Sequence, residues 1–288
     1  MNPPGEGTVN QSEQAPIKPA RPKASLWTHL VCYFFMAPLV CLYTAVLGTL
    51  SVMCSPFDKS GRKQHAFARL WSKLILKTCF SPVEVVGLEQ IDLSRPHVYC
   101  ANHISAMDIP ILYASLPIQF RILAKIELFK VPFIGWHLRH SGQIPVDQSN
   151  ARAAVRSLGH AVKAIEAGTP LVIFPEGGRS MTGQITPFMG GPFHISIKSQ
   201  TDIVPMAIVH SFEMLPMNSR LVYPQRLKLI VGEPVSPAGY TLKQADQLVA
   251  KVQQVIEDLY YAESQVPDPR TSAAQPPMSA PSPSQVLQ

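Results

Sequence analysis

The sequence lacks the cysteine pattern of a disulfide-bonded or zinc-binding protein. Its 288 residues include five cysteines, an odd number, and no two of them form a Cys-x-x-Cys pair. Most lie in apolar surroundings, where cysteine behaves as a small hydrophobic residue. We therefore expect buried free thiols, as in a reducing compartment, and neither a disulfide framework nor a metal site. The five are Cys32, Cys41, Cys54, Cys79 and Cys100.

Charge is missing from a long stretch near the N-terminus. Residues 24–57 contain no Asp, Glu, Lys or Arg and are dense in large apolar side chains, so they meet the requirement of roughly 20 apolar residues for a membrane span. A cleaved signal peptide is disfavoured, because the run is too long for the apolar region of such a peptide. One tilted span, a kink at Pro38 and two short helices in one leaflet all fit the sequence. Basic residues flank the run, more of them on its C-terminal side, which predicts a cell-membrane protein with its main domain in the cytoplasm.

The two ends of the chain have few large apolar residues. Residues 1–23 and 265–288 are rich in Pro, Ser, Gln and Ala, so they bury too little surface to offset the entropy of ordering, and we predict disordered tails. Between them we expect a membrane-associated helical region at 24–80 and one α/β domain at 81–264. Within the first, residues 67–80 interleave apolar side chains with lysines, which fits an interfacial amphipathic helix or a helix packed into the core.

Signatures of nucleic-acid binding are also missing. The basic residues are dispersed, and the sequence contains no zinc-finger, helix-turn-helix or RNA-recognition motif. The net charge of +6 nevertheless favours anionic partners. Phospholipid head groups, coenzyme A phosphates and an acidic carrier protein fit this charge, and nucleic acid is not expected as a partner.

Strand-like and helix-like runs alternate beyond residue 82. Longer amphipathic segments predict helices at 150–167 and at about 241–262. Such alternation is typical of an α/β fold, here a mixed, largely parallel sheet flanked by helices, with binding sites at the strand ends. Short apolar runs predict strands at 97–101, 120–124, 143–146, 171–174, 203–209 and 227–231.

His103 and Asp108 are candidate catalytic residues. His103 comes directly after a predicted strand, at the edge of the sheet where catalytic groups gather. Asp108, which looks like a helix N-cap, can hold one imidazole nitrogen if the turn between them brings its carboxylate close. The other nitrogen then accepts a proton as a general base. In the alternative interpretation, Asp108 only caps a helix and His103 satisfies a buried backbone group.

The second candidate block is Phe174-Pro-Glu-Gly-Gly-Arg-Ser180, which follows another predicted strand. Its two glycines allow a sharp turn that offers backbone amides to an anion, and Arg179 adds a bidentate guanidinium. Taken alone, the block is also ordinary turn chemistry. With the first block it suggests acyl transfer to a phosphate-bearing hydroxyl.

These blocks resemble the motifs of the 1-acylglycerol-3-phosphate O-acyltransferase (lysophosphatidate acyltransferase) family and its glycerolipid acyltransferase relatives. Residues 102–108 fit the family's His-x4-Asp motif, and residues 174–180 fit its Phe-Pro-Glu-Gly-x-Arg-Ser motif. Residues 142–147 and 204–208 resemble two further blocks. The resemblance covers roughly residues 81–235 and implies a glycerolipid acyltransferase-like α/β fold with an N-terminal membrane-associated helical segment.

The resemblance implies a membrane-bound enzyme of phospholipid biosynthesis. It would move a fatty acyl group from acyl-CoA or acyl carrier protein to the free hydroxyl of 1-acylglycerol-3-phosphate, giving phosphatidate. No metal or cofactor is implied, and the partners are membrane lipids, the lysolipid and the acyl donor. By this resemblance His103 is the base, Asp108 holds it, and the residues that bind or shape the acceptor are Lys125, Glu176, Gly177, Arg179 and Ser180.

Two positions depart from the family pattern. Gln148 stands where the family usually has an arginine, and Gly178 where it often has a threonine. Losing the cation removes a charge-assisted contact of about 1.5–3 kcal/mol, so the acceptor could instead be a different lysolipid, such as a lyso-ornithine lipid.

Two further functions fit the same residues. One is a non-catalytic membrane lipid-binding protein, in which the basic loop recognises head groups and His103 is dispensable. The second is a serine hydrolase with Ser105 or Ser180 as nucleophile, although the sequence lacks the usual Gly-x-Ser-x-Gly elbow of such enzymes.

The substitution His103→Ala is expected to abolish acyl transfer while leaving the protein folded and membrane-bound. A positioned general base contributes about 10²- to 10⁴-fold to the rate. The measurement is transfer of a labelled acyl group to a lysolipid, with circular dichroism as the control for folding. Near-normal turnover of the variant would contradict the assignment of His103 as the general base.

Overall fold

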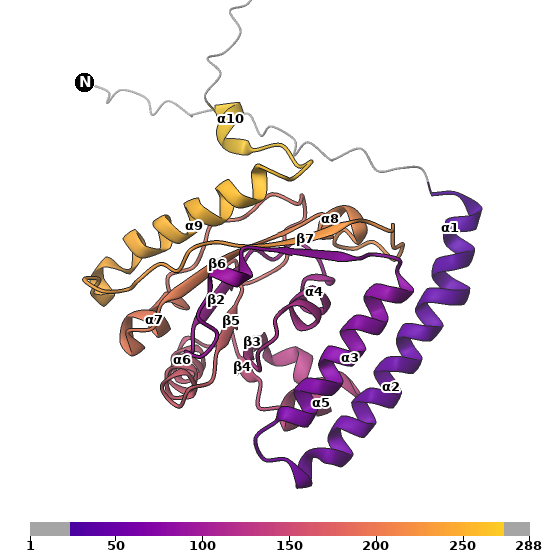
Figure 1. Cartoon of the computed structure of the whole chain (residues 1–288), viewed down its shortest axis with the longest axis horizontal. Helices are drawn as coiled ribbons and strands as arrows, with labels where there is room; N and C mark the ends of the chain where they lie inside the picture. Colours follow the sequence, from indigo (N-terminus) through magenta and orange to yellow (C-terminus); the bar gives the residue numbers. More distant parts are fainter. Residues whose placement is uncertain (1–23, 274–288) are drawn as a thin grey trace, which may run out of the picture.

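A seven-stranded sheet, in the order β1-β7-β6-β2-β5-β3-β4, lies at the centre of the chain (Figure 1). The computed structural model describes residues 24–273, so the expected tail at 1–23 and residues 274–288 lie outside the described part. Every pair of neighbouring strands is parallel except β6 and β7, which confirms the predicted mixed, largely parallel sheet. The strands are β1 Val83–Val86, β2 Val98–Ala101, β3 Arg121–Lys125, β4 Ile144–Val146, β5 Leu171–Ile173, β6 Ile203–Val209 and β7 Leu227–Val231.

All six strands expected from the sequence are present, each within one residue of its expected bounds. Strand β1 is the one strand of the sheet that the sequence did not predict. It pairs with β7 at the edge of the sheet, and its four residues alternate between half-buried and exposed. A short edge strand of this kind carries too little apolar periodicity to be recognised from sequence.

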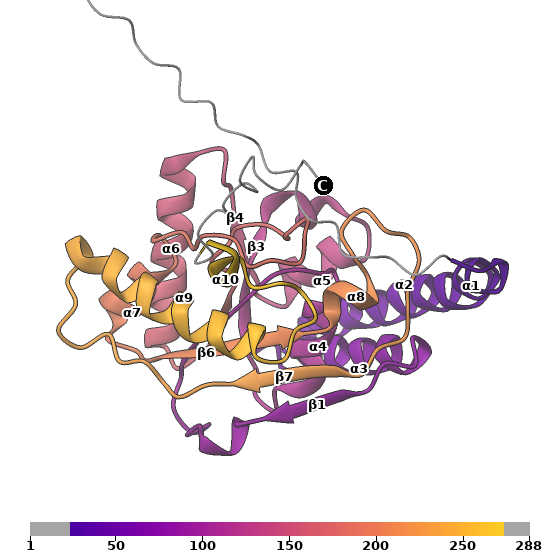
Figure 2. The ribbon, with the colours of Figure 1, turned by 90° about the horizontal axis from the view of Figure 1, so that it is seen from above.

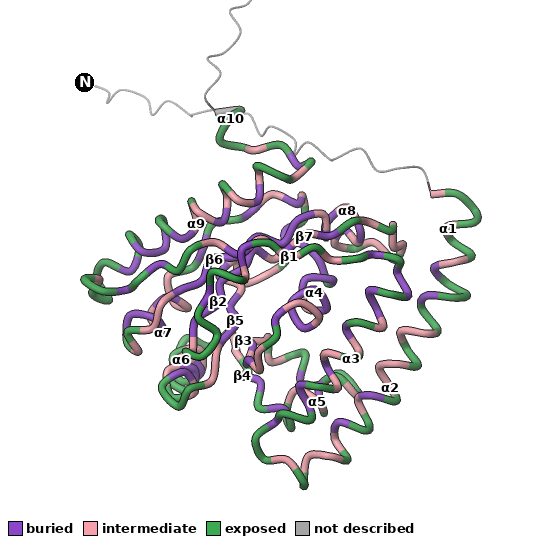
Figure 3. Tube along the Cα trace, viewed as in Figure 1, coloured by how far each residue is buried: buried purple, intermediate pink, exposed green. Residues whose placement is uncertain are grey.

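Helices cover both faces of the sheet, as a parallel sheet requires (Figures 1 and 2). Helices α6, α7 and α9 pack on one face, and α3 and α4 pack on the other. The central strands β2, β5 and β6 are buried along their whole length, as the tube in Figure 3 shows. The helices are α3 Arg62–Thr78, α4 Asp108–Ser115, α5 Ile134–His140, α6 Ala151–Glu166, α7 Phe193–Ser199, α8 Ser211–Met214, α9 Ala245–Tyr261 and α10 Pro269–Ala273, with 3-10 turns at Leu88–Gln90 and Leu242–Gln244.

The two helices predicted from amphipathic periodicity are confirmed as α6 and α9. Helix α6 begins after Asn150, whose side chain accepts a hydrogen bond from the Ala153 amide at 3.1 Å. It ends before Gly168, whose φ of +85° suits the residue that follows a helix. Helix α9 follows a 3-10 turn with a capping box between Thr241 and Gln244.

The charge-free N-terminal stretch folds as one continuous helical run of 32 residues, Leu26–Phe57, with a mean hydropathy of 2.2. It consists of α1 Leu26–Leu30, a π-helical stretch Val31–Met36, α2 Ala37–Cys54 and a 3-10 turn Ser55–Phe57. The π-helical stretch ends just before Pro38, which has no N–H for the regular helical ladder. The run is therefore a single helix with a local irregularity and not two separate helices.

Helix α3 returns along α2 and packs between α2 and α4. The Trp71 indole donates a hydrogen bond to the Thr44 hydroxyl of α2 at 2.9 Å. Ala68, Ile75 and Leu76 are buried, so this part of α3 packs one of its faces into the core. The lysines of α3 and Leu70 stay on its exposed side.

Residues 265–273, which the sequence assigns to the C-terminal tail, make contacts with the rest of the chain. Residues 265–273 are part of the described structure, because Val266 is buried and the Arg270 guanidinium pairs with Asp268 at 2.8 Å and with Asp258 at 2.7 Å. These contacts attach α10 to the end of α9. Composition alone does not reveal them, because they depend on a single apolar side chain and one guanidinium.

His65 of α3 is a buried histidine in an aromatic environment. Its ring lies 5.1 Å from the Tyr113 ring and 4.8 Å from the Phe120 ring. Burial, reinforced by the charges of Arg69 and Arg121, lowers the pKa of His65 to about 4. Between about pH 6.5 and that value the unfolded chain binds a proton that the folded chain does not, so the free energy of unfolding falls as the pH falls.

We expect the wild-type protein to lose more thermal stability between pH 7 and pH 5 than the variant His65→Phe, because that variant has no proton to take up on unfolding. The loss attributable to His65 is at most about 1.4 kcal/mol per pH unit. Thermal unfolding at the two pH values measures it, with His160→Phe, at an exposed histidine of α6, as the matched control. An equal drop in Tm for wild type and His65→Phe would contradict the assignment.

Candidate active site

His103 and Asp108 form a hydrogen-bonded pair beyond the carboxyl end of β2. The His103 Nδ1–H donates to Asp108 Oδ2 at 2.7 Å; the Asp108 side chain is fully buried, and the His103 side chain is 18% exposed. Within residues 24–273, His103 Nε2 makes no hydrogen bond to protein. The pair therefore has the geometry of an oriented base, whose Nδ1–H is held and whose Nε2 is free to accept a proton.

Asp108 is the first residue of α4, and its carboxylate closes the preceding loop. Oδ2 also accepts from the amides of Ile104, at 2.8 Å, and Ser105, at 2.9 Å. Oδ1 accepts from the Ser211 hydroxyl at 2.6 Å. A buried carboxylate is tolerated only when its oxygens are satisfied in this way, and these donors fix its position relative to the imidazole.

Ser211 has no counterpart among the residues singled out from the sequence. It follows β6, the parallel neighbour of β2, so the two strands end at the same edge of the sheet. The Asn102 side chain extends this pairing, since it exchanges two hydrogen bonds with the Ile208 backbone at 2.7 and 3.0 Å. A small polar residue just after a buried strand was the available signal, but choosing β6 required the strand order.

Phe174 holds the plane of the imidazole. Its ring stacks on His103 with the centroids 4.2 Å apart and the planes at 26°. The Asp108 carboxylate fixes the direction of the imidazole, and the Phe174 face limits its rotation. The first residue of the second block thus contacts the imidazole directly.

The second block turns back onto the first. The Ser180 amide donates to the His103 carbonyl at 3.0 Å, and the His103 amide donates to Glu176 Oε1 at 2.6 Å. Glu176 Oε2 accepts from both the amide and the hydroxyl of Thr186, at 2.8 and 2.7 Å. Burial raises the pKa of Glu176, and these donors oppose that shift. Glu176 therefore joins three backbone segments, and both of its oxygens are occupied.

Neither candidate serine nucleophile is placed for attack. The Ser105 side chain is buried and donates to the Leu215 carbonyl at 2.8 Å. Ser180 is 3% exposed, and its hydroxyl accepts from the amides of Thr182 and Gly183. Neither hydroxyl is hydrogen-bonded to His103, so the geometry opposes a serine hydrolase. It also gives Ser180 a place inside the turn instead of on the open side of the site.

Two cations stand at the open side of the glycine turn. Lys125, at the end of β3, and Arg179 are both exposed, and neither makes an ion pair within the described part of the chain. The Lys125 Nζ lies 3.7 Å from the position that a Cβ on Gly178 would take. Either cation can therefore bind an anion without breaking an existing ion pair within the described residues.

Gln148 supports the turn from the residues after β4. Its Nε2 donates to the Gly177 carbonyl at 2.9 Å. Gly177 has a φ of +70°, a backbone conformation that strains residues with a Cβ and therefore favours glycine. The residue that departs from the family pattern thus orders the turn through a neutral hydrogen bond.

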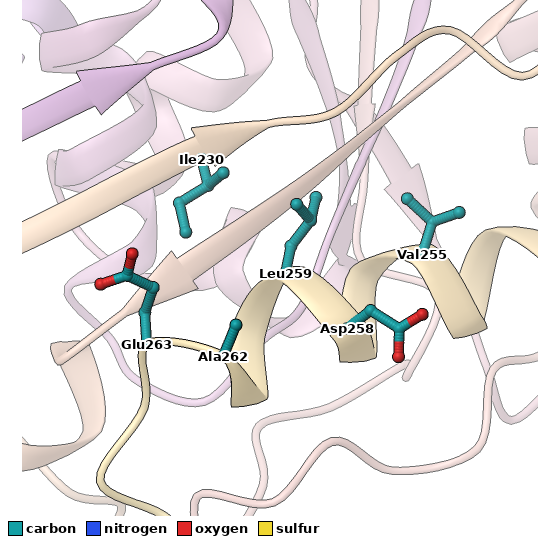
Figure 4. Close-up of a pocket in the computed structure, with 6 residues that line it drawn as sticks. All are labelled: Ile230, Val255, Asp258, Leu259, Ala262 and Glu263. Atoms are coloured by element: carbon teal, nitrogen blue, oxygen red, sulfur yellow. The ribbon is translucent and has the colours of Figure 1, made fainter.

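Two cavities differ in how well they suit a lipid substrate. One, of about 100 Å³, lies between α2, α3, α4 and α5, is mostly apolar and includes Ile109, the neighbour of Asp108. The other is a groove between β7 and α9, with Asp258 and Glu263 beside apolar side chains (Figure 4). Of these two, only the first is lined by residues of α4, the helix that begins at Asp108. Within residues 24–273, no three His, Cys, Asp or Glu side chains are grouped as metal ligands.

Comparison with known proteins identifies a matching family model and several similar acyltransferases. Residues 82–209 match the family model described as Acyltransferase. The 1-acyl-sn-glycerol-3-phosphate acyltransferase of Helicobacter pylori is 32% identical over 163 residues, which is 56% of this chain and 69% of that protein. The enzyme of the same name from Saccharomyces cerevisiae is 27% identical over 233 residues, covering 78% of this chain and 77% of that protein.

A longer relative and a solved structure extend the comparison. The chloroplastic 1-acyl-sn-glycerol-3-phosphate acyltransferase BAT2 of Brassica napus is 29% identical over 212 residues, or 71% of this chain, and the chain spans only 60% of that relative's length. The crystal structure of PlsC, the 1-acyl-sn-glycerophosphate (LPA) acyltransferase of Thermotoga maritima, matches with a TM-score of 0.68 and 25% identity. That match covers 83% of this chain and 96% of that one.

The variant Ser211→Ala is expected to lower kcat while leaving the KM of the acceptor unchanged, because Ser211 acts through Asp108 and does not face the acceptor. A hydrogen bond to a charged group contributes about 1.5–3 kcal/mol, so kcat should fall at least about ten-fold. The matched control is Ser196→Ala, a serine that is also fully buried but donates to the Thr201 carbonyl. Equal kcat values for the two variants would remove Ser211 from the site.

Proposed function

This chain belongs to the 1-acyl-sn-glycerol-3-phosphate acyltransferase family, and from that premise we propose that it transfers a fatty acyl group to the free hydroxyl of a 1-acylglycerol-3-phosphate. The product is phosphatidate, so the reaction belongs to phospholipid biosynthesis. The observation that carries the proposal is the hydrogen-bonded His103–Asp108 pair at the same edge of the sheet as Lys125 and Arg179, two cations that make no ion pair within residues 24–273. A base next to an anion site suits a substrate that carries a hydroxyl and a phosphate.

The proposed chemistry is a direct attack on a thioester. His103 Nε2 removes the proton from the acceptor hydroxyl while the hydroxyl oxygen forms a bond to the thioester carbonyl carbon. The tetrahedral intermediate then expels the thiolate, the C–S bond breaks, and the imidazolium returns its proton to sulfur. The Asp108 carboxylate stabilises the imidazolium between these steps. Acyl-CoA or acyl carrier protein supplies the thioester.

The acceptor phosphate is proposed to bind at the glycine turn. Lys125 contributes a compact charge and Arg179 a fork that matches two phosphate oxygens. Gln148 does not add a third charge, because its amide is used on the Gly177 carbonyl. Two cations still suffice for a phosphate monoester, whereas a zwitterionic lyso-ornithine lipid offers no phosphate to them. This difference favours lysophosphatidate over lyso-ornithine lipid as the acceptor.

The N-terminal helix is proposed to hold the enzyme on the cell membrane from the cytoplasmic side. One face of α2 packs on α3 and α5, so lipid cannot surround this helix, and we place its other face in the bilayer. That face, α1 and the π-helical stretch between them expose large apolar residues, which favours burial in lipid. They include Leu26, Trp27, Phe34, Phe35, Leu42, Val46, Leu50 and Met53.

The variant Arg179→Ala is expected to raise the KM for lysophosphatidate about ten-fold or more, with kcat nearly unchanged, because a charge-assisted contact to the phosphate is lost. The assay offers acyl-CoA, and separately acyl carrier protein, with a panel of lysolipids to the wild type, to this variant and to Arg156→Ala. Arg156 is an exposed arginine of α6 and serves as the matched control.

The panel separates the candidate functions. Product from lysophosphatidate that disappears in His103→Ala supports the proposal. Product only from another lysolipid would overturn the acceptor assignment while keeping the reaction class. No product with either donor would instead favour a lipid-binding protein without turnover.

A further inference from the structure

A second apolar surface lies outside the N-terminal helix. It is formed by the 3-10 helix η4, Ile126–Lys130, by α5 and by the residues between them. Four large apolar side chains there are 37–45% exposed, a cluster that a water-soluble surface rarely carries without a partner. We call this surface, made of Leu128, Val131, Ile134 and Trp136, the η4–α5 patch.

The patch runs from the anion site to α2. At one end, Lys125 precedes η4 and lies beside the glycine turn. At the other end, Phe133 Cβ lies 3.0 Å from the Cβ position of Gly48 in α2, and His137 of α5 is hydrogen-bonded to Ser51 at 2.7 Å. The α5 and α2 ribbons accordingly lie close together (Figures 1 and 2). The apolar surface of α2 therefore continues through α5 and η4 toward Lys125 and the glycine turn.

The patch is also rigid and basic. A Cβ on Gly135 would lie 2.3 Å from the Phe129 carbonyl oxygen, so α5 packs directly against the backbone of η4. Lys130, Arg139 and His140 are exposed in the same segment of the chain, and Glu127 is the single acidic residue in 125–140. Exposed aromatic and aliphatic groups within a basic rim are the composition of a surface that rests on anionic phospholipid.

We propose that the η4–α5 patch is a second membrane contact. Leu128, Val131 and Trp136 enter the boundary between head groups and acyl chains, while Lys130 and Arg139 meet the lipid phosphates. This inference deepens the proposed function, because it sets Lys125 and the glycine turn at the depth of the head groups. A lysolipid then reaches His103 with its phosphate at the surface and its acyl chain still in the bilayer.

Tryptophan fluorescence tests the contact without using turnover. The chain has three tryptophans, so the full-length variant Trp27→Phe with Trp71→Phe keeps Trp136 as its only one. Bound to vesicles of phosphatidylcholine and phosphatidylglycerol with brominated acyl chains, Trp136 should be quenched about two-fold or more, because bromine quenches only at close range.

The control for position is Tyr240→Trp in a chain whose three tryptophans are replaced by phenylalanine. Tyr240 packs on the other face of the sheet, and its emission should not change. Equal emission of Trp136 with and without bromine, in protein that still co-sediments with the vesicles, would overturn the proposal.

Kinetics supply an independent test through Leu128→Asp. Its KM should rise about ten-fold for lysophosphatidate presented in vesicles, because an apolar anchor is lost. Its KM for a short-chain, water-soluble acceptor should stay the same. The matched control is Val155→Asp at a 65% exposed residue of α6, which should change neither value.

The outcomes separate this inference from the proposed function. Normal transfer by the wild type, together with an unquenched Trp136 in the single-tryptophan variant, overturns the membrane contact and leaves the proposed reaction intact. If Trp136 is quenched but the protein transfers no acyl group, the membrane contact is supported and the proposed reaction is contradicted. If Leu128→Asp raises only the KM for acyl carrier protein, the patch binds this acidic carrier, and the bilayer assignment is overturned.

Discussion

The buried carboxylate of Asp108 is the group on which the rest of the site depends. Asp108 is fully buried, and an ionised carboxylate is tolerated away from water only when its oxygens accept a full set of hydrogen bonds. Two backbone amides, the His103 ring and the Ser211 hydroxyl supply them. Satisfying this one charge forces the loop after β2, the first turn of α4 and the end of β6 into a single arrangement, and the imidazole is oriented as a result.

Glu176 gives the second half of the site the same kind of constraint. One oxygen holds the amide of His103 and the other holds Thr186, so the glycine turn cannot move independently of the base. The parallel sheet makes this possible, because β2 and β5 are neighbours and end at the same edge. The oriented base and the two cations therefore lie at one edge of the sheet, where a lysolipid would present its hydroxyl and its phosphate together.

The N-terminal helix and the catalytic domain are one packed unit. Helix α2 is joined to α3 through Thr44 and Trp71 and to α5 through Ser51 and His137. A domain fastened in this way to an apolar helix cannot turn freely relative to it. If the outer face of α2 lies in lipid, as we propose, the packing also determines which part of the sheet edge faces the bilayer, and the η4–α5 patch lies on that side.

Local patterns in the sequence were sufficient for six strands and for helices α6 and α9, because burial periodicity is encoded by near neighbours. They offered His103 and Asp108 only as a candidate pair, because the sequence does not show whether the turn between the two residues brings their side chains together. The sequence could not place Ser211, which is 103 positions from Asp108, or show that Glu176 and Thr186 hold the base in place. It also left open whether residues 67–80 pack in the core, and it did not reveal β1 or the ordered residues 265–273. Each of these depends on contacts between segments far apart in the chain. Only the strand order and the packing of helices on the sheet decide which distant segments meet.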